Sequence, residues 1–133
     1  MRTLFSSVIL LTLFQLPANA QQSPDVFDCI RNSANMSEMM ACTDTYIDHW
    51  QSEMQRNYQR LHAVLPEARQ IMLEESQEMW NMYRIQHGDL SNAIHFGSGS
   101  DTDRLSGRIR IGLMYMNRNT QLQELYEITI DTF

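Results

Sequence analysis

The sequence contains no lysine, and its ten arginines are outnumbered by sixteen aspartate and glutamate residues, giving a formal net charge of −6. An acidic chain repels phosphates, so this composition argues against binding to nucleic acid. It suits a basic protein partner better, because opposite net charges speed encounter. The sequence also lacks a serine or cysteine nucleophile motif, a phosphate-binding loop and a His-Glu-x-x-His run. We therefore expect no enzymatic activity, no cofactor and no metal site.

The chain also lacks an apolar run long enough for a comfortable membrane span. Its N-terminus has a basic start at Arg2, an apolar run over residues 4–16 and the segment Pro17-Ala18-Asn19-Ala20. This pattern predicts a secretory signal peptide over residues 1–20 with an Ala-x-Ala cleavage site. No cysteine follows that site to carry a lipid anchor. We expect residues 21–133 to form one exported, soluble domain without a membrane anchor, in the periplasm.

Cysteine is scarce, with only Cys29 and Cys42 in the chain. They do not have the Cys-x-x-Cys spacing of a reactive thiol pair. Export places them in an oxidising compartment, where a disulfide is the default. A Cys29–Cys42 bond would stabilise the domain by roughly 3 kcal/mol in the chain-entropy model.

Glycine and proline are absent from one long stretch, residues 35–65. Apolar and ring-bearing residues recur there at steps of three or four, which predicts a long central helix with one apolar face. They are Met39, Cys42, Tyr46, Trp50, Met54, Tyr58, Leu61 and Leu65. Asn35 and Glu38 form a candidate capping box at its start.

Further helices are predicted on both sides of this one. A short helix covers residues 25–31, and a second long helix follows Pro66 and ends at His87-Gly88. We expect its face of Ala68, Met72, Met79, Met82 and Tyr83 to point inward, together with Trp80, and Arg84 to pair with a glutamate. Residues 87–103 are expected to be an irregular loop, the last helix to begin near Asp101 or Asp103, and residues 127–133 to be a frayed tail. The fold class is all-α: a small bundle of three to four helices with one disulfide.

Several of these segments resemble the LprI-type lysozyme-inhibitor domain family. The matching elements are Cys29, Met39-Met40-Ala41-Cys42, Tyr46, Met54-Gln55-Arg56-Asn57-Tyr58, Gln77-Glu78-Met79-Trp80-Asn81-Met82-Tyr83-Arg84 and Arg118-Asn119-Thr120-Gln121-Leu122-Gln123-Glu124-Leu125. The family's second cysteine pair is absent, and His87 stands where the third cysteine would be. The Gly-Ser loop that follows is therefore not stapled by a disulfide here.

The resemblance implies an exported helical protein that binds and blocks a lysozyme-like peptidoglycan hydrolase (muramidase). Similar small exported proteins serve as immunity partners of type VI secretion toxins that cut peptidoglycan, and we expect that role here. A muramidase cleft carries two carboxylates. The loop offers hydroxyl, imidazole and guanidinium groups for them, and carboxylates for a basic rim. These candidate partner-binding residues are His87, Asp89, His95, Ser98, Ser100, Asp101, Asp103 and Arg104. A plain surface linker is the alternative interpretation of this segment.

Three other interpretations stay open. Met36, Met39 and Met40 lie about one helical turn apart, and soft thioethers suit Cu(I), so a periplasmic copper-binding protein is the main alternative function. Glu74, Glu75 and Glu78 would have to lie in a cleft to make the protein a glycosidase, whereas three glutamates on one exposed helix are more often a solvated face.

The third interpretation concerns Gly107 and Gly112. They mark a seam between helices, either within the fold or between two copies in a homodimer.

Overall fold

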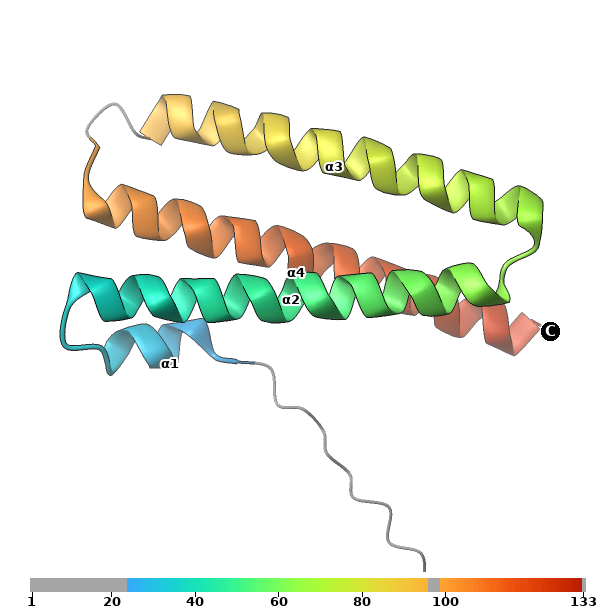
Figure 1. The fold of residues 1–133 in the computed structure, drawn as a ribbon, viewed down its shortest axis with the longest axis horizontal. Helices are drawn as coiled ribbons and strands as arrows, with labels where there is room; N and C mark the ends of the chain where they lie inside the picture. The colour runs from blue at the N-terminus through green and yellow to red at the C-terminus, as the bar shows by residue number, and fades with distance from the viewer. Residues whose placement is uncertain (1–23, 96–98, 133) are drawn as a thin grey trace, which may run out of the picture.

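A computed structural model describes residues 24–95 and 99–132 of the chain. The described part contains four helices and no strands: α1 (Val26–Arg31), α2 (Met36–Val64), α3 (Glu67–His95) and α4 (Asp101–Thr132). Figure 1 shows the three long helices along one axis in alternating directions, α2 and α4 from left to right and α3 from right to left, with α1 against the start of α2. The predicted all-α bundle is confirmed. The predicted signal peptide, residues 1–20, lies outside the described residues.

Helix α2 forms as its sequence predicts, with its cap and its apolar face. The Asn35 side chain accepts a hydrogen bond from the Glu38 N–H (3.0 Å), and Glu38 Oε2 accepts one from the Ala34 N–H (2.7 Å). Tyr46, Met54 and Leu61 are buried on the predicted face. The helix ends at Val64 because Leu65 is extended (φ −85°, ψ 143°), as a residue before proline usually is.

The core lies mainly between α2 and α4, which pack along most of their length. Its buried members are Met54, Leu61, Leu73, Tyr115 and Leu122, and Trp50, Tyr58, Trp80 and Tyr126 pack around them. A buried hydrogen bond crosses the same seam, from Asn57 Nδ2 to Asn119 Oδ1 (2.7 Å). Polar groups at such a depth need partners, and this pair fixes the register of the two helices.

Gly112 makes the close approach of α4 to α2 possible. A Cβ on Gly112 would lie closer than 3.0 Å to two ring carbons of Tyr46, which is 5% exposed. Of the two locations that the sequence leaves open for a glycine seam, the structure therefore places Gly112 in one within the fold. Whether two copies of the chain also associate stays a prediction.

Helix α1 is tied to α2 by the disulfide between Cys29 and Cys42, whose Cα atoms are 5.8 Å apart. This separation is typical of disulfides, and the predicted pairing is confirmed. Asp25 caps α1 by accepting hydrogen bonds from the N–H groups of Phe27 and Asp28.

Helix α3 presents a different face to the bundle from the one its apolar pattern predicts. Its inner side carries Leu73, Gln77 and Trp80, whereas Tyr83 is exposed. A row of exposed apolar residues runs along the side turned away from α2 and α4. We call it the outer stripe: Met72 (66% exposed), Met79 (64%), Tyr83 (57%), Leu90 (58%) and Ile94 (66%). The predicted inward face of Ala68, Met72, Met79, Met82 and Tyr83 is thus wrong.

Two predicted helix ends are also wrong. Helix α3 continues through His87-Gly88 to His95, and α4 continues to Thr132 where a frayed tail is expected. Beyond Gly88, Arg110 of α4 donates to Ser91 Oγ (3.0 Å), a tertiary contact that favours the longer α3. Near the C-terminus, the Arg60 guanidinium lies 4.3 Å from the centre of the Tyr126 ring and holds α4 against α2.

Candidate partner-binding surfaces

The residues predicted to bind a partner fall into two groups rather than one loop. His87 and Asp89 are exposed and lie within α3, where the His87 ring stacks on the Tyr83 ring with 5.5 Å between centroids. His95 is the last residue of α3, and Ser98 lies outside the described residues. The structure therefore corrects the predicted loop at residues 87–95, because those residues are helical.

The second group forms the start of α4. Ser100 Oγ accepts a hydrogen bond from the Asp103 N–H (3.2 Å) and donates one to Asp103 Oδ2 (2.7 Å). Arg104 and Asp101 form an ion pair of 3.5 Å in which both side chains are more than 60% exposed. This arrangement caps the helix and leaves a polar, solvent-facing end. Partner binding by these residues stays a prediction.

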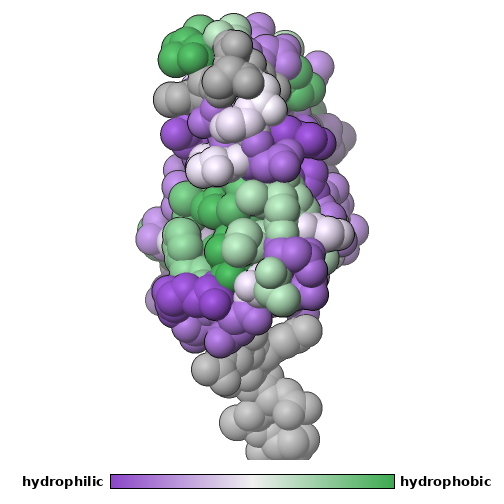
Figure 2. All heavy atoms as spheres, turned by 90° about the vertical axis from the view of Figure 1, so that its left-hand side faces the viewer, coloured by the Kyte–Doolittle hydropathy of each residue, from purple (hydrophilic) through white to green (hydrophobic). Residues whose placement is uncertain are grey.

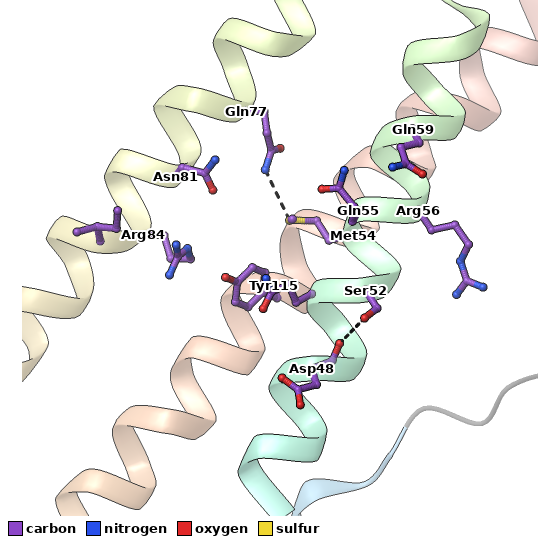
Figure 3. A pocket seen from close by; sticks show the side chains of 12 residues that line it. Asp48, Ser52, Met54, Gln55, Arg56, Gln59, Gln77, Asn81, Arg84 and Tyr115 are labelled. Atoms are coloured by element: carbon purple, nitrogen blue, oxygen red, sulfur yellow. Dashed lines mark hydrogen bonds between the residues drawn. The ribbon is translucent and has the colours of Figure 1, made fainter.

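An open groove of about 1100 Å³ lies between α2 and α3, with part of α4 at its floor. Figure 3 shows Asn81 and Arg84 reaching it from α3, and Gln55 and Gln59 from α2. The lining is rich in amides and adds Asp48, Gln51, Ser52, Met54, Arg56, Gln77, Ile85 and Tyr115. No sequence pattern predicts this groove, because amides at helical spacing are typical of an ordinary solvated face.

Arg84 does not have the glutamate partner that the sequence predicts. Its guanidinium lies over two rings, 5.8 Å from the centre of Trp80 and 5.2 Å from that of Tyr115. Its Nε is buried and has no hydrogen-bond partner among the described residues. The aromatic faces attract this cation, which places it at the inner wall of the groove.

A second arginine joins α3 to α4 from within. Arg118 is 8% exposed, and its guanidinium donates to Gln77 Oε1 (3.1 Å), Ser76 Oγ (3.0 Å) and Gln121 Oε1 (3.3 Å). All three partners are neutral, and burial lowers the pKa of Arg118. Helix α3 is therefore held in the bundle by these polar contacts as well as by the packing of Leu73 and Trp80.

Hydrophobic residues are conspicuous on the outside of α3. Figure 2 views the bundle end-on and shows a few hydrophobic residues at its top, by the end of α3, and a larger hydrophobic area lower down. A single exposed apolar residue is ordinary, but five along one line of a helix are not, even with polar residues such as Ser76 and Gln86 between them. The outer stripe is thus a candidate contact surface, although three of its members, Met72, Met79 and Tyr83, were expected in the core.

Two kinds of feature, a His, Cys, Asp and Glu cluster for a metal ion and a membrane-spanning helix, are not found among the described residues. Residues 24–95 and 99–132 contain no group of three His, Cys, Asp or Glu side chains placed to hold a metal ion. That finding does not concern the thioethers of Met36, Met39 and Met40, so the copper alternative stays a prediction. None of the described helices is both long enough and apolar enough to cross a membrane.

Comparison with known proteins agrees with the resemblance in the sequence. A family model described as "Lysozyme inhibitor LprI" matches residues 29–128. The match begins at the first disulfide cysteine and covers α2, α3 and nearly all of α4. No curated protein and no solved structure was found to match the chain.

Proposed function

Since this chain belongs to the lysozyme inhibitor LprI family, we propose that it binds and occludes a lysozyme-like peptidoglycan hydrolase. The observation that carries this proposal is the extent of the family match, residues 29–128, which includes the whole three-helix bundle apart from its last turn. The family is one of inhibitors rather than enzymes, which fits a chain without a catalytic motif.

The mechanism is occlusion by a preformed surface, without chemistry. Three long helices and a disulfide present exposed side chains on a rigid frame, so little conformational freedom is lost on binding. The exposed polar start of α4, with Ser100, Asp101 and Arg104, faces the cleft of the enzyme. The net charge of −6 attracts a basic enzyme.

The biological role that fits best is protection of the cell's own wall. Residues 1–20 direct the protein to the periplasm and are removed there. In that compartment the disulfide forms, and the protein neutralises an antibacterial muramidase delivered by type VI secretion. An immunity protein of this kind acts in a one-to-one complex and needs no cofactor.

Inhibition assays test the biochemical part of the proposal. The oxidised protein, residues 21–133, is added to a panel of purified c-type, g-type and i-type lysozymes and to muramidases captured from periplasm and from competitor secretions. We expect one or more of them to lose cell-wall hydrolysis at a one-to-one ratio. Full activity of every enzyme at excess inhibitor would refute inhibition as the function.

A protection assay tests the biological part. Cells that direct an inhibited muramidase to their periplasm should survive when they also produce the full chain. The matched control begins at Gln21, lacks the predicted signal peptide and should not protect. Equal survival with both forms would contradict a periplasmic site of action.

A further inference from the structure

The outer stripe of α3 has the form of a helix-docking surface. Met72 and Leu90 are eighteen residues apart, which is five helical turns, and Met79, Tyr83 and Ile94 lie close to the same line. The stripe is about 33 Å long at 1.5 Å per residue. Helices that dock into a groove use anchors at this spacing.

Each of these side chains is more than half exposed, although the His87 ring stacks on Tyr83. Two of the five are methionines, whose flexible thioethers adapt to the shape of a partner. Tyr83, near the middle of the stripe, adds an aromatic ring with a polar hydroxyl group, and such side chains are common anchors of protein interfaces.

Charge along one edge of the stripe indicates which partner fits. Glu75, Glu78 and Asp89 are exposed and lie together on one flank, at 100° per residue around the helix. Over its whole length α3 carries five carboxylates and two arginines, a formal charge of −3. An apolar centre beside a charged rim is the usual composition of a protein–protein interface.

A peptidoglycan hydrolase has the complementary chemistry. Its substrate carries many carboxylates, so a basic surface around its cleft speeds encounter with the wall. An apolar patch beside that basic surface would meet the outer stripe while basic groups meet the acidic flank. A second copy of this chain fits less well, because antiparallel pairing of two stripes about a twofold axis puts both acidic flanks on the same side.

We propose that the outer stripe and its acidic flank form the docking surface for a basic peptidoglycan hydrolase. This assignment rests on the proposed inhibitory function and adds the surface that carries it. The stripe provides most of the affinity by desolvating its five apolar side chains, and the flank mainly speeds association.

Binding and inhibition are measured on a panel lysozyme that the wild-type protein inhibits. Met79→Glu should weaken binding at least about 30-fold, because it places a charge in the centre of the interface. The matched control is Ile128→Glu on α4, since Ile128 and Met79 are both 64% exposed. The control should bind within about twofold of wild type. Circular dichroism should show the same helix content and melting behaviour for both variants.

The effect of charge is tested with Glu78→Arg, and the control is Glu124→Arg at a site on α4 that is also exposed. Glu78→Arg should slow association by about threefold to tenfold at low salt, and 0.5 M salt should remove the difference. Glu124→Arg should slow association less than Glu78→Arg does.

The outcomes separate this assignment from the proposed function. Inhibition by wild type with equal affinities of Met79→Glu and Ile128→Glu would overturn the docking surface and leave the function standing. A free protein that sediments as a dimer, and that Met79→Glu turns into a fully inhibitory monomer, would assign the stripe to a second copy. If wild type inhibits no enzyme of the panel or the captured set, function and docking surface fall together.

Discussion

Two glycines inside helices should respond to the same substitution with opposite signs. Gly112 lies in α4 against the buried ring of Tyr46, whereas an added Cβ on Gly88 in α3 meets nothing within 4 Å. In a helix interior alanine is favoured over glycine by about 1 kcal/mol, so propensity alone predicts that Gly88→Ala and Gly112→Ala both stabilise the protein.

At Gly112 a steric term works against that gain. The new methyl group would lie closer than 3.0 Å to two ring carbons of Tyr46. This ring has little room to move, because it packs edge-on against Trp50 with centroids 6.3 Å apart and its hydroxyl donates to Met116 Sδ (3.6 Å). Overpacking of a tight core costs about 1–3 kcal/mol, and more where a backbone must shift. We expect a net loss of roughly 1–2 kcal/mol for Gly112→Ala and a gain of up to about 1 kcal/mol for Gly88→Ala.

Thermal and urea unfolding of the oxidised protein measure both effects. For a domain of this size 1 kcal/mol corresponds to a shift in Tm of about 4 °C. Adding Tyr46→Leu to Gly112→Ala should recover part of the loss, with a coupling free energy above about 0.5 kcal/mol. A Gly112→Ala protein as stable as wild type would refute the close packing of α4 on α2 at this point.

Three further perturbations test other parts of the structure. Replacing Cys29 and Cys42 by serine should lower the unfolding free energy by roughly 3 kcal/mol, and an unchanged Tm would contradict a role for the disulfide in stability. Arg118→Met should lower the free energy of unfolding by about 1–3 kcal/mol. It should also raise amide hydrogen exchange more in α3 than in α2, because the hydrogen bonds of Arg118 join α3 to α4. An equal rise in both helices would contradict this role of Arg118. Burial and, secondarily, the charge of Arg56 lower the pKa of His49. The fold thus favours the neutral ring, so stability should be complete above the usual histidine pKa and fall on acidification through it, and His49→Gln should reduce that fall. A histidine titration by NMR at or above the usual pKa would contradict this.

The sequence predicts the fold best where a helix has a single apolar face, because only that face can be buried. In α2 the only continuous apolar face runs from Met39 to Leu65, so the sequence identifies both the helix and its buried side. The capping box at Asn35 could be predicted because it involves only neighbouring residues. The disulfide could be predicted because the chain has only two cysteines.

Helix α3 could not be oriented from its sequence, because it has two candidate inner faces. One is the apolar face from Ala68 to Tyr83, and the other mixes Leu73 and Trp80 with Gln77. Hydrophobic periodicity favours the first, but the bundle buries the second. Arg118, on a different helix and 41 residues beyond Gln77, hydrogen-bonds to the buried face, and a long-range polar contact of this kind leaves no periodic signal in the sequence.

The ends of α3 and α4 were missed for a related reason. A glycine just past the last turn commonly ends a helix, yet Gly88 lies in the interior of α3, where Arg110 and Ser91 connect the following turns to α4.

The groove between α2 and α3 could not be predicted either, since its amides come from separate helices and become neighbours only in the fold.

The orientation of α3 also bears on what the protein does. A helix with an apolar row long enough for a core, yet held in the bundle by Arg118, Gln77 and Ser76 through polar contacts, keeps that row available for a partner. An exposed apolar row favours aggregation, so its retention is easier to understand if binding regularly covers it. The hydrogen bonds of Arg118 to Gln77 and Ser76 therefore support binding, because they help to hold α3 with its apolar row facing outward. Arg118→Met should then weaken inhibition through altered placement of α3 even though Arg118 is buried and cannot touch the enzyme. Inhibition by Arg118→Met equal to wild type, at a temperature where the variant is fully folded, would show that α3 need not be held in this orientation for binding.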